Sequence, residues 1–306
     1  MYGIRVEKTT QKRRKNMKKF IAMALAAIAT FATVSFASCG DKKTENENNQ
    51  LVKTVEIKLT EEEYAFVTKK TNTALVESFN DFLAGIKADG TFDALVAKYF
   101  EGTGEKVGYD VTTTDVTNSD DNLVVVTNCP FEPFEYIGDD GKIYGLDIEI
   151  AAAYASANDL TLVIKNIGFD DIFTQVDADY ADIGMAGITV SEDRAALYGF
   201  TNKYYQASQK LIVAADNTDF DNCKTVEDAE AVLKNLSGKK IGYQIGTTGG
   251  MYVVGDADWG YDGFANIEGK GYATAQDAVV DLINGNLYAV IVDEAPANAL
   301  VKSANN

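Results

Sequence analysis

Short apolar segments alternate with amphipathic segments over most of the chain. The apolar segments are rich in Val, Ile and Leu, and amphipathic stretches such as 147–158 and 275–284 separate them. Alternation of this kind is typical of parallel sheets covered by helices. It predicts an α/β fold with strands at 123–127, 160–165, 181–186, 210–215, 239–243 and 287–292.

Two regions depart from this alternation. Residues 136–143 carry a polar Gly/Asp turn between apolar arms, which predicts one antiparallel hairpin. Between 72 and 88 the apolar residues recur at helical spacing, which predicts a helix with one buried face that stops near Gly90. A second short helix is expected at 92–100, followed by a linker rich in Gly, Thr and Asp.

The first 50 residues have the features of an export signal. An almost wholly apolar run from 20 to 37 follows Lys18 and Lys19 and ends at the sequence Phe-Ala-Ser-Cys. This pattern resembles a bacterial lipoprotein signal, which makes 1–38 a leader and signal peptide and Cys39 the lipidated residue. An uncleaved membrane anchor is the alternative, and Met17 is a second candidate start. The polar segment 39–50 is expected to be a flexible stalk.

Composition excludes several classes of function. The 306 residues include no histidine, so Ser-His-Asp triads, Cys-His dyads and histidine-ligated zinc are impossible. The formal net charge is −18, and such an acidic surface repels nucleic-acid phosphates. Cys129 and Cys223 lack CxxC spacing and are expected to be free thiols instead of a disulfide or a metal pair.

Two segments at strand ends carry candidate binding residues in the first half of the fold. Residues 128–136 place two of the chain's three prolines and two phenylalanines after a strand, where open α/β sheets bind ligands. A turn with core phenylalanines is the alternative. Residues 186–194 end a strand and open a helix at Ser191, with Arg194 in its first turn. A guanidinium beside free N–H groups makes a carboxylate clamp, although a surface ion pair is the simpler interpretation.

Two further segments occupy equivalent places in the second half. Residues 246–250 are glycine-rich and lie between a strand and a helix, where free N–H groups attract anions. They lack the Lys-Ser/Thr of a nucleotide-binding P-loop. Asp293 ends the last strand where a helix begins, and serves either as a ligand partner or as a plain helix cap.

Together these segments resemble the polar amino-acid-binding proteins of ABC importers, solute-binding family 3, from about residue 122 to 306. The motifs occur in the order NxxFxPFEY, GLDIEI, GFDDI, AGITxSEDR, GYQIGTTGG and VDEAP. The resemblance implies the periplasmic-binding-protein type II fold, in which two α/β lobes joined by two crossing hinge strands close on one free amino acid. It implies an ABC permease as partner, a monomer and no cofactor.

The resemblance also implies a role for each site residue. Arg194 forks onto the ligand's α-carboxylate, assisted by N–H groups of Thr189 and Thr248. Asp293, the Gly187 carbonyl and the Thr189 hydroxyl take the α-ammonium group. A buried zwitterion needs both charges paired, because an unpaired buried charge costs several kcal/mol. The remaining implied contacts, to the ligand side chain and around it, are Phe131, Phe169, Asn128, Gln244 and Thr247.

Asn128 and Gln244 are neutral, so the sequence favours a neutral polar amino acid as the ligand over a cationic one. The specific amino acid is left open. The alternative from another functional class is an enzyme, a dehydratase built on the same fold, in which Glu132 or Asp293 would act as general acid. A sensor module is a third alternative. The leading hypothesis is a binding protein, not an enzyme, anchored by lipid to the outer face of a bacterial membrane.

The order of the segments departs from the family. Residues 60–102 resemble the segment that normally closes the family's C-terminus, yet here they precede the other motifs. We therefore predict a circular permutation, with the chain rejoined through the linker 101–121. The expected parts are a continuous lobe 1 at 66–207, a split lobe 2 at 51–63 and 210–306 that includes a strand at 52–59, and hinges near 63–67 and 204–210.

Overall fold

The computed structural model describes residues 50–306 apart from 114–115, 117–118 and 120. The predicted leader 1–38, the lipidation site Cys39 and all but the last residue of the stalk lie outside the described residues. Over the described ranges, no helix combines the length and the apolar character needed to cross a bilayer.

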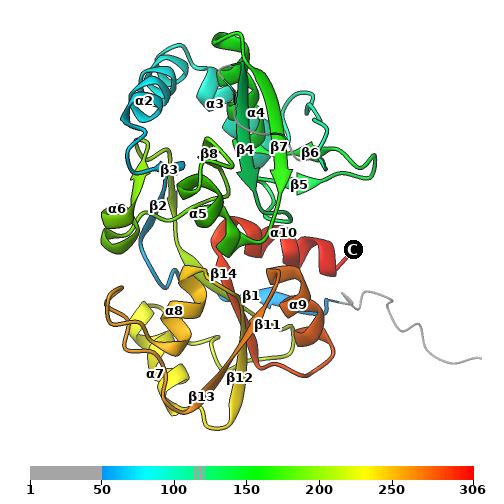
Figure 1. Cartoon of the computed structure of the whole chain (residues 1–306). Helices are drawn as coiled ribbons and strands as arrows, with labels where there is room; N and C mark the ends of the chain where they lie inside the picture. Colours follow the sequence, from blue (N-terminus) through cyan, green and yellow to red (C-terminus); the bar gives the residue numbers. More distant parts are fainter. Residues whose placement is uncertain (1–49, 114–115, 117–118, 120) are drawn as a thin grey trace, which may run out of the picture. The chain divides into compact units, whose positions relative to one another are not determined.

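The first of two five-stranded sheets has the order β7-β4-β8-β3-β9. Its strands β4 and β7 lie side by side in Figure 1. Its central part is parallel, because β4 pairs in parallel with both β7 and β8, whereas β3 runs antiparallel to β8 and β9. The strands are β3 (Val67–Lys69), β4 (Asn122–Thr127), β7 (Thr161–Asn166), β8 (Ile183–Gly184) and β9 (Tyr198–Phe200).

Helices α2 to α6 belong to this half of the fold. Helix α2 (Thr73–Ala88) begins after Asn72, whose side chain accepts from the Leu75 N–H, and it buries Phe79, Leu83 and Ile86. The Phe79 ring stacks on Tyr154, with centroids 3.7 Å apart. The remaining helices are α3 (Thr91–Val96), the π-helical turn η1 (Ala97–Glu101), α4 (Leu146–Ala157), α5 (Phe169–Asp177) and α6 (Glu192–Leu197).

The second five-stranded sheet has the order β1-β11-β14-β12-β13. Here β12 pairs in parallel with β13 and β14, whereas β11 runs antiparallel to β1 and β14. Its strands are β1 (Val52–Thr54), β11 (Gln209–Ala214), β12 (Lys239–Gln244), β13 (Ile267–Tyr272) and β14 (Ala289–Asp293). The associated helices are α7 (Val226–Asn235), α8 (Thr248–Val254), α9 (Ala275–Ile283) and α10 (Glu294–Ala304).

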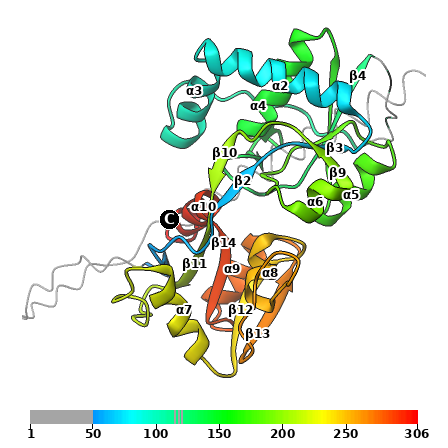
Figure 2. The same cartoon turned by 90° about the vertical axis from the view of Figure 1, so that its left-hand side faces the viewer.

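The chain passes between the two sheets twice, through β2 (Glu62–Tyr64) and β10 (Tyr205–Ala207). The two strands lie side by side (Figure 2) and pair antiparallel. In this pairing Tyr64 is opposite Tyr205. These segments overlap the stretches that the sequence marks as hinges, and they lie side by side. Two paired strands between two sheets are the geometry that a hinge requires.

The last described residues lie beside the first ones. The Asn305 side chain accepts from the backbone N–H groups of Leu51 at 2.8 Å and Val52 at 3.2 Å. It also donates to the Val52 carbonyl at 2.9 Å. Residue 51 and the end of α10 are therefore neighbours in space, and a short connection would join them.

Several secondary-structure expectations need correction. The sheets are mixed instead of parallel. The strands that come just before and just after β2 and β10 in the chain run antiparallel to their neighbours: β1 pairs with β11, and β3 pairs with β9. Strand β13 lacks the apolar pattern of a buried strand and escapes prediction. The strand expected at 52–59 ends as β1 at Thr54, although the Leu59 N–H still bonds to the Gln209 carbonyl at 2.9 Å. The hairpin at 136–143 is confirmed as β5 (Tyr136–Ile137) and β6 (Ile143–Tyr144).

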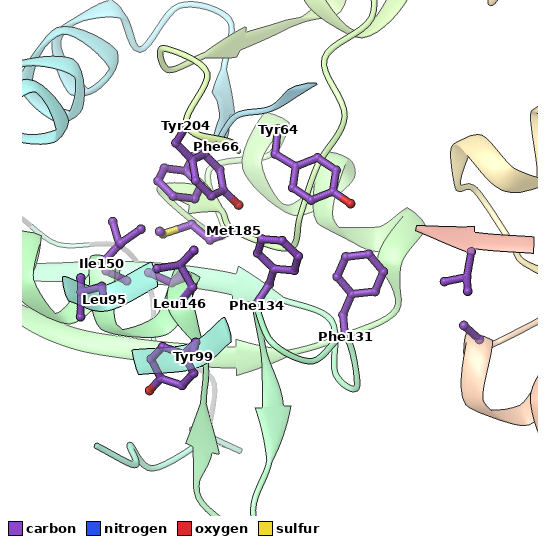
Figure 3. Packing of buried hydrophobic residues seen from close by; sticks show 14 of the residues in the cluster. Tyr64, Phe66, Leu95, Tyr99, Phe131, Phe134, Leu146, Ile150, Met185 and Tyr204 are labelled. Carbon is purple, nitrogen blue, oxygen red and sulfur yellow. The ribbon is translucent and has the colours of Figure 1, made fainter. Parts of the chain in front are cut away.

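An aromatic cluster fills the core beside the hinge (Figure 3). Tyr64 of β2 meets Phe134 edge to face at 5.2 Å, and Phe134 lies 5.8 Å from Phe131. Phe66 stacks on Tyr204 at 4.5 Å. The cluster joins β2 and the segment after it, the loop after β4 and the start of β10, so it holds the strand pair β2–β10 and the candidate loop in one packed unit.

Candidate functional site

The ten residues that the sequence implies for ligand binding line one pocket. They come from both halves of the fold, and Glu135 and Ala186 complete the wall. The pocket has a volume of about 20 Å³, which is space for about one water molecule. The implied residues are Asn128, Phe131, Phe169, Gly187, Thr189, Arg194, Gln244, Thr247, Thr248 and Asp293.

Arg194 lies at the start of α6, in the helical turn that the sequence predicts. The Ser191 hydroxyl accepts from the backbone N–H of Arg194 at 3.1 Å and caps the helix. The guanidinium is buried, donating to the Thr189 carbonyl at 2.8 Å and to the Gly246 carbonyl at 3.0 Å. Burial lowers the pKa of Arg194 to about 10, so it is charged at neutral pH.

Aromatic rings surround the same guanidinium. Its central carbon lies 4.9 Å from the ring centres of Phe173 and Trp259, and 5.7 Å from that of Phe169. Contacts at these distances are cation–π interactions. The rings fix the plane of the guanidinium while both of its hydrogen bonds go to neutral carbonyl groups. The arginine is thus held in place with its charge unpaired by any direct carboxylate contact.

Asp293 ends β14 at the opposite side of the pocket. Only 6% of the residue is exposed, and its Oδ1 accepts from the Tyr64 hydroxyl at 2.6 Å. Burial and the negative charge of Glu62 raise the pKa of Asp293 to about 7. This carboxylate is therefore more than a plain helix cap: its side chain makes no capping bond in α10.

Thr189 follows β8 and contributes a hydroxyl whose direction is set by a neighbour. It donates to Glu62 Oε2 at 2.6 Å, and the Thr60 hydroxyl donates to the other oxygen of the same carboxylate at 2.6 Å. Gly187 stands two residues earlier, where its φ of +52° suits glycine and where a Cβ would meet the Phe131 ring at 2.5 Å. Glycine at 187 therefore lets the backbone approach the pocket wall.

One direct contact crosses the pocket between the loop after β4 and the end of β12: Gln244 Nε2 donates to Asn128 Oδ1 at 2.7 Å. The Asn128 amide in turn donates to the Ile167 carbonyl of its own half at 2.6 Å. Thr247 and Thr248 begin α8 directly after this strand, and the Thr247 hydroxyl donates to the Gln244 carbonyl at 2.8 Å. The neutral amides satisfy each other in this arrangement.

Glu135 is the pocket residue that the sequence analysis missed. The residue is completely buried, and neither carboxylate oxygen has a hydrogen-bond partner among the residues that the structure describes. Burial and the nearby charge of Asp147 raise its pKa well above the usual range. Its backbone carbonyl accepts from the Phe131 N–H at 2.7 Å. Glu135 belongs to the motif NxxFxPFEY, and its place in that motif is the signal that would have pointed to it.

Glu62 and Tyr64 were not predicted either, because the resemblance of 60–102 to the family's closing segment implies no site role for them. The structure brings both to the site through β2. By contrast, Glu132, one of the two carboxylates considered as a general acid, is exposed and faces another pocket beside α10. Of those two carboxylates, Asp293 alone lines the candidate site.

Sequence relatives of this chain are amino-acid-binding proteins by name. The chain is 27% identical over 221 residues to the ABC transporter arginine-binding protein 1 of Escherichia coli K12, covering 72% of this chain and 74% of that one. It is 26% identical over 184 residues to the L-cystine-binding protein of the same strain, covering 60% of this chain and 63% of the relative.

Solved structures share the arrangement. An ancestral arginine-binding protein bound to arginine is 30% identical, with a TM-score of 0.53 over 61% of this chain and 76% of that chain. An ancestral amino acid-binding protein described as a precursor of cyclohexadienyl dehydratase has a TM-score of 0.52 over 60% of this chain and 75% of that chain. At 24% identity, the second likeness concerns the fold alone.

A family model matches residues 123–299, which is more than half of the chain and includes all ten implied site residues. The order of strand-end motifs, the two sheets joined by paired strands and the pocket between their loops agree with that match. The chain belongs to the bacterial extracellular solute-binding proteins, family 3.

Proposed function

We propose that the protein captures a free basic amino acid outside the cytoplasmic membrane and delivers it to an ABC transporter permease. The observation that carries the ligand class is the unpartnered buried carboxylate of Glu135 on the wall of a pocket that already holds Arg194 and Asp293. The names of the relatives, arginine-binding among them, support the same class.

The backbone part of the ligand is matched by opposite charges. Arg194 would fork onto the α-carboxylate in place of its present carbonyl acceptors, because a charge-assisted pair is stronger than a bond to a neutral carbonyl. Asp293, the Thr189 hydroxyl and the Gly187 carbonyl would accept from the α-ammonium group. The N–H groups of Thr189 and Thr248 would assist the carboxylate, and Thr247 lies next to them.

The side chain of the ligand meets one more negative group. With Arg194 and Asp293 committed to the zwitterion, Glu135 is left for the side chain. Burial and the charge of Asp147 favour the protonated form of Glu135 while it has no partner, and a guanidinium or ammonium group of the ligand would favour the ionised form by pairing with it. We therefore replace the expectation of a neutral ligand, which rested on Asn128 and Gln244 alone, with a cationic one. Phe131 and Phe169 would sandwich its aliphatic stem.

Ligand entry requires the pocket to open. A volume of about 20 Å³ holds about one water molecule, not an amino acid. The bonds Arg194–Gly246 and Gln244–Asn128 cross the site and would break as the two halves part. The strand pair β2–β10 would serve as the hinge, with lobe 1 at 66–207 and lobe 2 at 51–63 plus 210–306.

The arrangement along the chain is also part of the proposal. Residues 1–38 would direct export, and Cys39 would carry the lipid that anchors a monomeric receptor through the stalk 39–50. The order of the lobes would be a circular permutation of the family order. The proximity of Leu51 to Asn305 supports this, because permutation needs neighbouring surface ends.

A binding screen tests the function. Isothermal titration with the twenty amino acids, ornithine, citrulline and cystine should give the tightest binding for arginine, lysine or ornithine. Citrulline is the matched control, because it replaces the guanidinium of arginine with a neutral group of the same shape. Binding of citrulline as tightly as arginine would refute the basic class, and no binding of any amino acid would refute the function.

A dehydratase is the second candidate, favoured by the fold of the dehydratase precursor and by the pKa of about 7 for Asp293. A carboxyl group with a pKa near the working pH is suited to general acid catalysis. Release of product from cyclohexadienyl carboxylates, measured by ultraviolet absorbance, would support it. Loss of that turnover in Asp293→Asn but not in Glu132→Gln would assign the acid.

A further inference from the structure

The strand β2 reaches two pocket residues from different halves of the fold. Glu62 accepts from Thr189, which follows β8 of the first sheet, and Tyr64 donates to Asp293, which ends β14 of the second. Both contacts are buried and both are 2.6 Å long. Thr189 and Asp293 are the two side chains proposed for the ligand's ammonium group, and one hinge strand contacts them both.

We propose that Glu62 is a positioning residue for the α-ammonium group of the ligand: it holds the Thr189 hydroxyl as an acceptor, while Tyr64 of the same strand contacts Asp293. This inference rests on the amino-acid binding proposed above. Glu62 lines no part of the pocket itself, so it acts through these two neighbours.

The effect on Thr189 follows from the number of protons available. A threonine hydroxyl has one proton to donate and two lone pairs that accept. The proton of Thr189 is committed to Glu62 Oε2, and the Thr60 hydroxyl occupies Oε1 of the same carboxylate. The lone pairs of Thr189 are then the groups that remain for the pocket. An ammonium ion, which has donors and no acceptor, is the partner they suit.

The effect on Asp293 is electrostatic. Burial is the largest cause of its raised pKa, and the charge of Glu62 is the next, whereas the bond from Tyr64 opposes them. Two carboxylates in one buried site resist simultaneous ionisation, which binding of an ammonium group relieves. The charged or titratable groups that interact with Asp293 are Glu62 and Tyr64 of β2, Arg194 of α6, Tyr205 of β10 and Tyr261.

The sign of the pH dependence follows. With a pKa of about 7, Asp293 is largely protonated at acidic pH and has lost the charge that pairs with ammonium. Affinity for an amino acid should therefore fall as the pH drops through about 7. Removing the charge of Glu62 lowers the pKa of Asp293, so the midpoint of this fall should move to lower pH.

The test compares wild type, Glu62→Gln and the matched control Glu63→Gln by calorimetric titration from about pH 5.5 to 8.5. Glu63 is the next residue of the same strand, pairs with Lys203 and lies outside the pocket. The probes are L-arginine and 5-guanidinopentanoate, which has the same carboxylate and guanidinium but no α-amino group. Thermal unfolding of each variant checks that it is folded.

In Glu62→Gln we expect arginine affinity at pH 8 to fall by about tenfold or more, and the midpoint to move to lower pH. Affinity for 5-guanidinopentanoate should change by less than about twofold, because that probe lacks the ammonium group. Glu63→Gln should match wild type with both probes. A purely structural role for Glu62 would instead weaken both probes equally and leave the midpoint in place, which overturns the proposal.

Thr189→Val provides a second measurement if Glu62→Gln does not fold. It removes the hydroxyl, so the ratio of arginine to 5-guanidinopentanoate affinity should fall about tenfold. An unchanged ratio would also overturn the positioning role. These failures differ from failure of the proposed function, in which wild type binds no amino acid at any pH. If wild type binds arginine and the Glu62→Gln variant has the same pH profile as wild type, only the role of Glu62 is refuted.

Discussion

The guanidinium of Arg194 donates to the Gly246 carbonyl at 3.0 Å and so bridges the loop that follows β8 and the loop that follows β12. The same group also bonds to the Thr189 carbonyl of its own half. Because both acceptors are neutral, an incoming carboxylate can replace them with a net gain in electrostatic energy. Arg194 therefore contacts both halves of the fold and is also the residue proposed to bind the ligand carboxylate.

Arg194→Ala should weaken amino-acid binding by about 2 to 5 kcal/mol, because the ligand carboxylate would be buried without its charge-assisted partner. Calorimetric titration with arginine measures the loss. Arg194→Lys keeps the charge but not the forked geometry, and its affinity should lie between those of wild type and the alanine variant. A loss of less than tenfold in the alanine variant would contradict the assignment.

Glu135→Gln should remove the preference for a cationic side chain. Its buried carboxylate would become a neutral amide of similar size, so arginine binding should weaken by about 2 kcal/mol or more while citrulline binding changes little. The ratio of the two dissociation constants is the measurement. Glu132→Gln, three residues earlier and exposed, is the control and should keep the wild-type ratio. Equal ratios in all three proteins would assign Glu135 to packing alone.

The free energy of unfolding should fall as the pH rises from about 5 to 8. Burial raises the pKa of Asp147 to about 7, although the hydrogen bonds from Tyr204 and Gly187 lower that pKa in part. The unfolded chain has an ordinary Asp pKa of about 3.9, so between these values the folded protein binds more protons and loses stability as they dissociate. Asp281, whose pKa is lowered, stays ionised throughout this range and contributes no slope.

Asp147→Asn tests this dependence by urea unfolding at several pH values. The variant should show a smaller slope than wild type, with part of it kept because Asp293 also has a raised pKa. Asp139→Asn changes an exposed loop carboxylate and should leave the slope as it is. A wild-type slope in Asp147→Asn would mean that other groups account for the whole effect.

Reversal of the proposed permutation should preserve folding and binding. The variant joins Asn306 to Leu51 through a short glycine-serine linker and opens the chain within 102–121, which would give the segment order that the proposal assigns to the family. The hydrogen bonds between Asn305 and Leu51 place the two ends within reach. Arginine affinity within about threefold of wild type and one cooperative unfolding transition are expected. If the variant fails to fold although its linker is long enough, the two segment orders do not support the same fold.

The sequence by itself determined the alternating α/β pattern, the hairpin at 136–143 and the strand-end residues of the pocket. Arg194, Asp293 and Asn128 follow strands whose apolar pattern is unmistakable, and loops after parallel strands gather at one edge of a sheet. Local pattern is sufficient there, because each residue's place depends on the strand that immediately precedes it.

Only the tertiary structure decided how Glu62, Tyr64 and Glu135 relate to that pocket. Glu62 lies 127 positions from Thr189, and Tyr64 lies 229 positions from Asp293, so no local pattern links them. The mixed strand directions likewise depend on where the chain passes between the sheets. Glu135 belongs to a visible motif, but its missing hydrogen-bond partner is a property of everything packed around it. Contacts between distant segments and the satisfaction of buried polar groups arise from packing, and local periodicity carries no record of them.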